Sequence, residues 1–112
     1  MDALSATWLS SRLGVGSARI ELMRRAGELL AVRQPGSQEY LYPGWQFDEH
    51  GRPRSVVRAL VAAAGDAGLS RDQLLELLQR RSGLVGGGTL LDALLAGRED
   101  QVVEAVRSAR AP

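Results

Sequence analysis

The spacing of apolar residues predicts a short helix near the N-terminus. Apolar side chains recur there at the spacing of one helical face: Leu4, Trp8, Leu9 and Leu13. Ser5 or Thr7 can cap the start of this helix, because a side-chain oxygen there can accept a hydrogen bond from an unpaired backbone N–H group. Gly14 then stands where a glycine commonly follows the last turn of a helix.

A second helix is expected over residues 17–26, with Ile20 and Met23 facing inward and arginines facing outward. Gly27 ends it. Two helices joined by a short turn that contains glycine are typical of a helix-turn-helix.

The pattern changes period in the next segment. Residues 29–33 and 39–42 are rich in side chains that suit strands, and they flank Gln34-Pro35-Gly36-Ser37. Proline presets its own φ and glycine accepts a positive φ, so this tetrapeptide predicts a tight turn. We expect a short hairpin, the wing of a winged helix, and we expect Trp45 and Phe47 to fold back onto the two helices.

The second half of the chain is predicted to be helical throughout. Apolar residues repeat at helical spacing over 56–64, 74–78, 90–95 and 102–106. Ser70 with Gln73 forms a capping-box pattern, and Thr89 with Asp92 resembles another helix start. The predicted fold is therefore mainly α with a small β-hairpin: a winged helix-turn-helix over 1–48, a polar linker over 49–55, and a helical module over 56–112.

Charge and cysteine content narrow the function classes. The formal net charge of the 112 residues is +1, and residues 1–55 hold seven arginines against six acids. A dedicated nucleic-acid binder usually has a clear basic excess, so DNA binding here would need a local patch and more than one copy of the chain. There is no cysteine, and the longest uncharged apolar run, 59–65, is too short to span a bilayer. With no signal-peptide profile, we expect a cytoplasmic protein that does not enter membranes.

Two features of the sequence are candidates for a catalytic or ligand-binding site, and neither supports catalysis. His50, the one histidine, lies in the polar linker, where it has neither a positioned partner nor a cleft, so zinc binding is also disfavoured. Gly86-Gly87-Gly88-Thr89 precedes a helix, but it lacks the Lys-Ser/Thr ending of a phosphate-binding loop and follows no strand. We therefore expect no enzyme, no metal and no cofactor.

The helix-turn-helix carries the candidate DNA-binding residues. In such motifs the second helix enters the major groove, and its N-terminal residues reach the base edges. The residues expected to contact DNA are Ser17, Ala18, Arg19, Arg24, Arg25 and Arg33. Arg19 can pair with guanine, and the other arginines can contact phosphates. Glu21 faces the same way and opposes this interpretation, so a helical hairpin used for packing or dimerisation stays an alternative.

At this point the sequence resembles a group of small bacterial regulators. Segments 8–15, 19–32 and 42–47 are similar to proteins that pair a MerR-like or Xre-like helix-turn-helix with a toxin-binding domain of the Xre/MbcA/ParS type. Segment 84–97, with its glycine run and leucine–acid pattern, looks like the signature of that domain, and residues 99–109 look like its closing helix.

The resemblance implies an antitoxin-like protein that binds a RES-type toxin through its C-terminal half and represses its own operon through its N-terminal half. It assigns partner binding to Leu84, Gly86, Gly87, Leu91, Leu94 and Val103. We expect a homodimer or a higher oligomer. The rival hypothesis is a protein-interaction or scaffold module without DNA binding, favoured by Glu21 and the small net charge.

Overall fold

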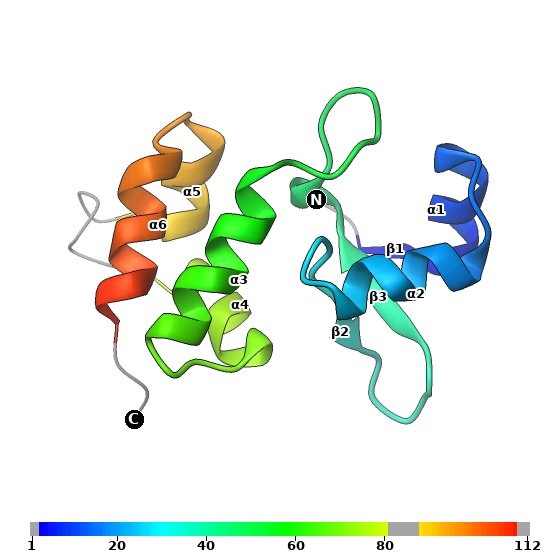
Figure 1. Ribbon diagram of the computed structural model, residues 1–112, viewed down its shortest axis with the longest axis horizontal. Coiled ribbons are helices and arrows are strands. Elements are labelled where there is room, and N and C mark those ends of the chain that lie inside the picture. The colour runs from blue at the N-terminus through cyan, green and yellow to red at the C-terminus, as the bar shows by residue number, and fades with distance from the viewer. Residues whose placement is uncertain (1–2, 81–87, 110–112) are drawn as a thin grey trace. The chain divides into compact units, whose positions relative to one another are not determined.

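The computed structural model describes residues 3–80 and 88–109 (Figure 1). The chain forms two compact units, Met1–Arg58 and Ala59–Pro112. The described residues are mainly helical, with six α-helices and a small three-stranded antiparallel sheet. The predicted combination of helices with a β-hairpin is therefore confirmed, and a third strand is added to it.

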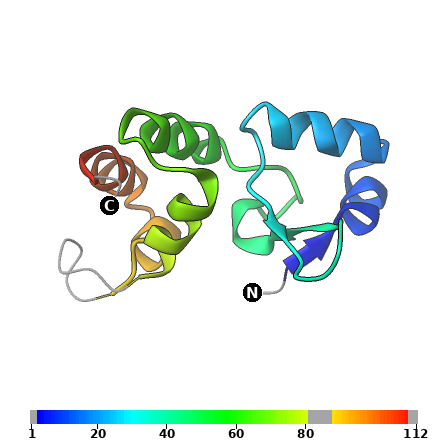
Figure 2. The ribbon, with the colours of Figure 1, turned by 90° about the horizontal axis from the view of Figure 1, so that it is seen from below.

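The first unit holds two helices and the whole sheet. Its elements are β1 (Ala3–Ser5), α1 (Ala6–Leu13), α2 (Ser17–Arg25), β2 (Val32–Arg33), β3 (Tyr40–Pro43) and a 3-10 turn (Gly44–Gln46). The central strand β3 pairs with β1 on one side and with β2 on the other. β2 and β3 form the predicted hairpin, and Gly36 adopts φ +75° in its turn, as the Pro-Gly pair requires (Figure 2).

The start of the chain differs from the prediction. Leu4 lies in β1, opposite Tyr42, and not on a helix. The helix begins only after Ser5, whose extended backbone and side-chain oxygen cap it by accepting a hydrogen bond from the Trp8 N–H group at 3.1 Å. Trp8 is 49% exposed, and the neighbouring Leu9 is fully buried instead. Adjacent helical residues point about 100° apart, so an eight-residue helix that buries Leu9 turns Trp8 outward.

The turn between α1 and α2 depends on one left-handed residue. Gly14 has φ +68°, and the next N–H group, of Val15, donates to the carbonyl of Ser10 at 3.1 Å. This is the hydrogen-bond pattern of a glycine-terminated helix. Gly16 then caps α2 in an extended conformation, φ −74° and ψ 160°, without a side-chain hydrogen bond.

Gly16→Ser should raise the free energy of unfolding by about 0.5–1 kcal/mol. The backbone at Gly16 suits any residue, a Cβ there meets nothing within 4 Å, and serine would supply the missing cap. Gly14→Ser is the matched control: it has equal open space, but its positive φ should make the change cost about 1–2 kcal/mol. Urea unfolding of both variants measures the difference. Stabilisation by both substitutions, or by neither, would contradict this account of the turn.

The core of the first unit joins the helices to the sheet. Its buried members are Leu9, Ile20, Leu29, Tyr42 and Phe47. Met23 packs against this cluster from the side, and Trp45 is also buried. The prediction that Trp45 and Phe47 fold back onto the two helices therefore holds for Phe47, which shares this cluster with Leu9 and Ile20, whereas Trp45 is buried without being a member of the cluster and Trp8 is exposed.

Among the described residues, the polar side chain that is fully buried is that of Gln46. Its amide group forms hydrogen bonds with two separate segments of the chain. Its amide oxygen accepts from the Leu30 N–H group at 2.7 Å, and its amide nitrogen donates to the carbonyls of Leu30 at 2.7 Å and Pro43 at 3.0 Å. The segment at Leu30, just before β2, thus obtains from a side chain the hydrogen bonds that a neighbouring strand would otherwise supply.

The polar segment after Phe47 folds into an ordered turn within the first unit. Phe47 pairs with Pro53, and the Asp48 carboxylate accepts hydrogen bonds from the backbone N–H groups of Arg52 and His50, at 3.0 and 2.9 Å. The bond from Arg52 and then that from His50 hold the pKa of Asp48 below its usual value. Residues 49–55, expected to form a linker, therefore have defined local structure.

The second unit is a group of helices around an aliphatic core. Helix α3 (Val56–Asp66) begins at the boundary of the units, and it is followed by α4 (Arg71–Gln79), α5 (Leu90–Leu95) and α6 (Glu99–Ser108). α5 contacts both α4 and α6. The larger buried side chains of these helices include Leu60, Leu74, Leu78, Leu90, Leu94, Val102 and Val106. The predicted capping box of Ser70 with Gln73 is present, and the helix start predicted at Thr89 is also a capping box, with Asp92.

Candidate nucleic-acid interface

Helix α2 presents two different faces. Ile20 is fully buried against the core, while Ser17, Ala18 and Arg19 in the first turn are exposed. Leu22, on the outer side, is 57% exposed. The first turn of α2 is therefore open to a large ligand, as the sequence predicted for the residues that would read base edges.

Arg19 is the predicted contact that the structure leaves most available. Its side chain is exposed, and within residues 3–80 and 88–109 no acidic group forms an ion pair with it. A guanidinium in that position can donate two parallel hydrogen bonds to an acceptor pair on a ligand.

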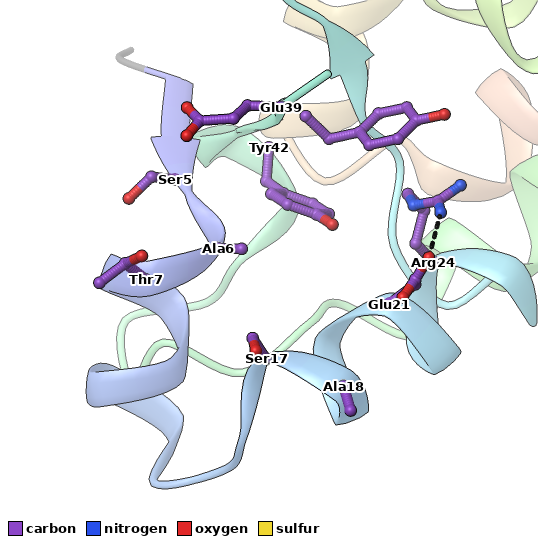
Figure 3. Close-up of a pocket in the computed structure, with 10 residues that line it drawn as sticks. Ser5, Ala6, Thr7, Ser17, Ala18, Glu21, Arg24, Glu39 and Tyr42 are labelled. Atoms are coloured by element: carbon purple, nitrogen blue, oxygen red, sulfur yellow. Dashed lines mark hydrogen bonds and ion pairs between the residues drawn. The ribbon is translucent and has the colours of Figure 1, made fainter. Parts of the chain in front are cut away.

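The charge of Glu21 is balanced within α2. Its carboxylate lies 3.0 Å from the Arg25 guanidinium. It also lies 3.4 Å from the guanidinium of Arg24 (Figure 3). Such pairs at i+3 and i+4 are favourable on a helix. Glu21 therefore does not project an uncompensated negative charge beside Arg19, although that charge was the sequence-level argument against DNA contact.

Arg24, one of the residues expected to contact phosphates, is largely buried and contacts the hairpin. Its side chain is only 17% exposed, and its guanidinium stacks over the Tyr40 ring at 4.1 Å from the centroid. Arg33, exposed on β2, lies over the same ring at 5.4 Å. Tyr42 is nearby: burial raises the pKa of its phenol, and the Arg24 guanidinium partly offsets that rise. Arg24 thus joins α2 to the hairpin, a role that its position in the sequence did not reveal.

The two units differ in charge. Eight arginines and six acidic residues fall in Met1–Arg58, whereas six arginines and seven acidic residues fall in Ala59–Pro112. The formal charge is thus +2 for the first unit and −1 for the second. The modest basic excess lies in the unit that contains α2.

The residues that the family resemblance assigns to a protein partner differ from one another in exposure, and some of them lie outside the described residues. Leu84, Gly86 and Gly87 lie outside the described residues. Leu91 and Val103 are half-buried, whereas Leu94 is 3% exposed and belongs to the core of the second unit. Leu95, next to it on α5, is 46% exposed and was not among the assigned residues.

The described part of the chain was compared with the requirements for a metal site and for a membrane-spanning helix. No group of three or more histidine, cysteine or acidic residues comes together there. His50 is well exposed, with Glu49 at 3.6 Å. None of the described helices has the length and apolar character needed to cross a bilayer.

Comparison with known proteins yields one informative match. No protein-family model matches the sequence, and no curated protein matches it either. Among solved structures, the fold is similar to the NMR structure of Rv2175c, with a TM-score of 0.82 over 96% of this chain and 80% of that chain, at 20% sequence identity. This likeness shows the fold. The comparisons give no support to the antitoxin assignment, to a toxin partner or to homodimerisation, which stay predictions.

Proposed function

We propose that this chain is a non-enzymatic DNA-binding regulator whose first unit acts as a winged helix-turn-helix. In this proposal α2 is the recognition helix and the β2–β3 hairpin is the wing. The observation that carries the proposal is the two-faced character of α2, which buries Ile20 and exposes Ser17, Ala18 and Arg19 at its N-terminal turn.

Four exposed side chains of the first unit contact DNA in this proposal. Arg19 donates to the O6 and N7 acceptors of a guanine in the major groove, and Leu22 can contact a thymine methyl group. Arg25 and Arg33 contact phosphates on either side of the groove. Arg24, which is stacked on Tyr40, holds the wing to α2 and does not itself reach the DNA.

The small basic excess of the first unit limits what one copy can do. Affinity for DNA depends on the number of phosphates that a protein neutralises, and a formal charge of +2 supports few such contacts. We therefore propose that two copies act together on half-sites about 34 Å apart, one helical turn of DNA. The antitoxin role of the second unit rests on the family resemblance and stays a prediction.

Arg19→Ala should weaken binding to the DNA upstream of the chain's own gene. If Arg19 reads a base, the loss is about 1–3 kcal/mol, or roughly 5- to 150-fold, and it should be smaller on DNA that lacks the preferred base. Fluorescence anisotropy at several salt concentrations measures this. Arg98→Ala removes an equal charge from an exposed position in the second unit, and it should leave the affinity nearly unchanged.

Two results would contradict the proposal. If the wild-type chain fails to bind the upstream DNA even at low salt, the chain is better described as a protein-interaction module. If Arg19→Ala and Arg98→Ala weaken binding equally on all sequences, α2 contributes only general charge attraction and is not the reading element.

A further inference from the structure

A pocket of about 390 Å³ opens between the N-terminal turns of α1 and α2 and strand β3 (Figure 3). Its size falls within the range of sites that hold small organic molecules. All of its lining residues belong to the first unit, and three separate segments of that unit contribute to it. The side chains proposed to contact DNA directly, Arg19, Leu22, Arg25 and Arg33, do not line this pocket.

The charged side chains that line the pocket are two carboxylates and one guanidinium, and the guanidiniums of Arg25 and Arg33 lie outside the lining, beside Glu21 and the Tyr40 ring. The ionisable lining consists of Glu21, Glu39, Arg24 and the phenols of Tyr40 and Tyr42. Arg24 is already engaged by Glu21 and by the Tyr40 ring, so those two opposite charges compensate each other. Within the described residues Glu39 forms no ion pair. Among the described residues, the Glu39 carboxylate is thus the charged group of the lining that has no oppositely charged partner.

Glu39 is also held in place by its backbone. Its N–H group donates to the Ser37 side-chain oxygen at 3.0 Å, and its carbonyl accepts from the Gln34 N–H group at 3.0 Å. The base of the side chain is thereby fixed at the end of the hairpin loop. A ligand cation would meet a carboxylate whose attachment point is ordered before binding, which lowers the entropy cost of binding.

The rest of the lining suits a flat organic body. The Tyr42 ring, which is only 3% exposed, forms part of the wall of the pocket (Figure 3). The methyl groups of Ala6 and Ala18 supply apolar surface, and the hydroxyls of Thr7 and Ser17 can accept or donate hydrogen bonds. Such a mixture of apolar walls and a few polar groups is typical of small-molecule sites.

We propose that this pocket is a binding site for a small organic amine with an aromatic body. The ammonium group lies against Glu39, and the ring fills the pocket beside Ala6 and the small exposed part of Tyr42. Inorganic phosphate and aromatic acids are disfavoured, because two carboxylates line the pocket and its one guanidinium is already paired with one of them.

Three ligands of nearly equal shape and different charge test this site. They are tyramine, the neutral alcohol tyrosol, and 4-hydroxyphenylacetate, titrated into the isotopically labelled full chain without DNA and followed by amide chemical shifts. Tyramine should bind with a dissociation constant on the order of millimolar, tyrosol more weakly and the acid weakest. Shifts should concentrate at Ser17, Ala18 and Tyr42. Equal binding of all three, tighter binding of the acid, or no saturable tyramine shift would overturn the proposal.

A pair of variants separates the contact with Glu39 from general charge attraction. Glu39→Gln should weaken tyramine binding about twofold to fivefold and leave tyrosol binding unchanged. Glu49→Gln removes the same charge from an exposed position outside the pocket, and it should change neither. Both positions are exposed, so neither substitution should unfold the chain. Equal weakening by the two variants would overturn the assignment of Glu39.

One consequence rests on the proposed function. Ser17 and Ala18 belong both to the pocket and to the surface proposed to face DNA, so tyramine and DNA should each change the other's affinity by the same factor. DNA affinity that is unchanged at saturating tyramine would overturn this coupling. The amine site is tested without DNA, and its failure is thereby distinguished from a failure of DNA binding.

Discussion

Gln46→Leu should lower the free energy of unfolding by about 2–4 kcal/mol. Leucine fills a similar volume, but it leaves the buried N–H and carbonyl groups of Leu30 without the partners they have at 2.7 Å. Each buried polar group that loses its partner costs about 1–3 kcal/mol. Urea unfolding, followed by circular dichroism and tryptophan fluorescence, measures the change.

Two further variants show that hydrogen bonding, and not packing, causes this loss. Gln38→Leu is the matched control, since Gln38 is exposed in the hairpin loop, and it should change stability by less than about 0.5 kcal/mol. Gln46→Glu keeps the shape but places an oxygen where the amide nitrogen donated to Leu30 and Pro43. It should be more destabilising at neutral pH than in mild acid, where a protonated carboxyl can donate. A Gln46→Leu variant as stable as the wild type would refute the role given to this side chain.

Ile20→Ala should destabilise the first unit by about 2–5 kcal/mol, which is the usual effect of truncating a fully buried aliphatic side chain. Ile20 is the buried residue of α2, so its truncation removes the main contact of that helix with the core. The loss should appear in thermal and urea unfolding.

Leu22→Ala is the control on the same helix. Leu22 is 57% exposed, and its truncation should change stability by less than about 0.5 kcal/mol. If DNA binding occurs as proposed, Leu22→Ala can still weaken it while leaving the fold intact. Equal destabilisation by the two substitutions would mean that α2 is not oriented as described.

The local elements of the fold followed from short-range patterns. The capping boxes at Ser70 and Thr89 and the Pro35-Gly36 turn involve residues no more than three positions apart, so the sequence alone contains all the groups concerned. The same holds for the first turn of α2, whose exposed residues were foreseen from the spacing of Ile20 and Met23.

The features that were missed all depend on partners distant in sequence. β1 is a strand because Leu4 lies opposite Tyr42, and a three-residue strand carries no periodic signal by itself. Trp8 shares the predicted apolar face of the first helix with Leu9, and apolar spacing does not say which of two adjacent large residues a short helix will bury. The position of Glu39 beside the N-terminal turns of α1 and α2 likewise depends on how the hairpin folds back.

By itself, the sequence determined the helix starts at Ser70 and Thr89 and the turn at Pro35-Gly36, because caps and turn residues act over a few positions. Tertiary structure alone decided what each arginine does. Arg19 and Arg24 look alike in the sequence, yet one is exposed and the other is stacked on Tyr40 from β3. The physical reason is that burial and stacking arise from contacts across the fold, and the spacing along one helix does not contain them.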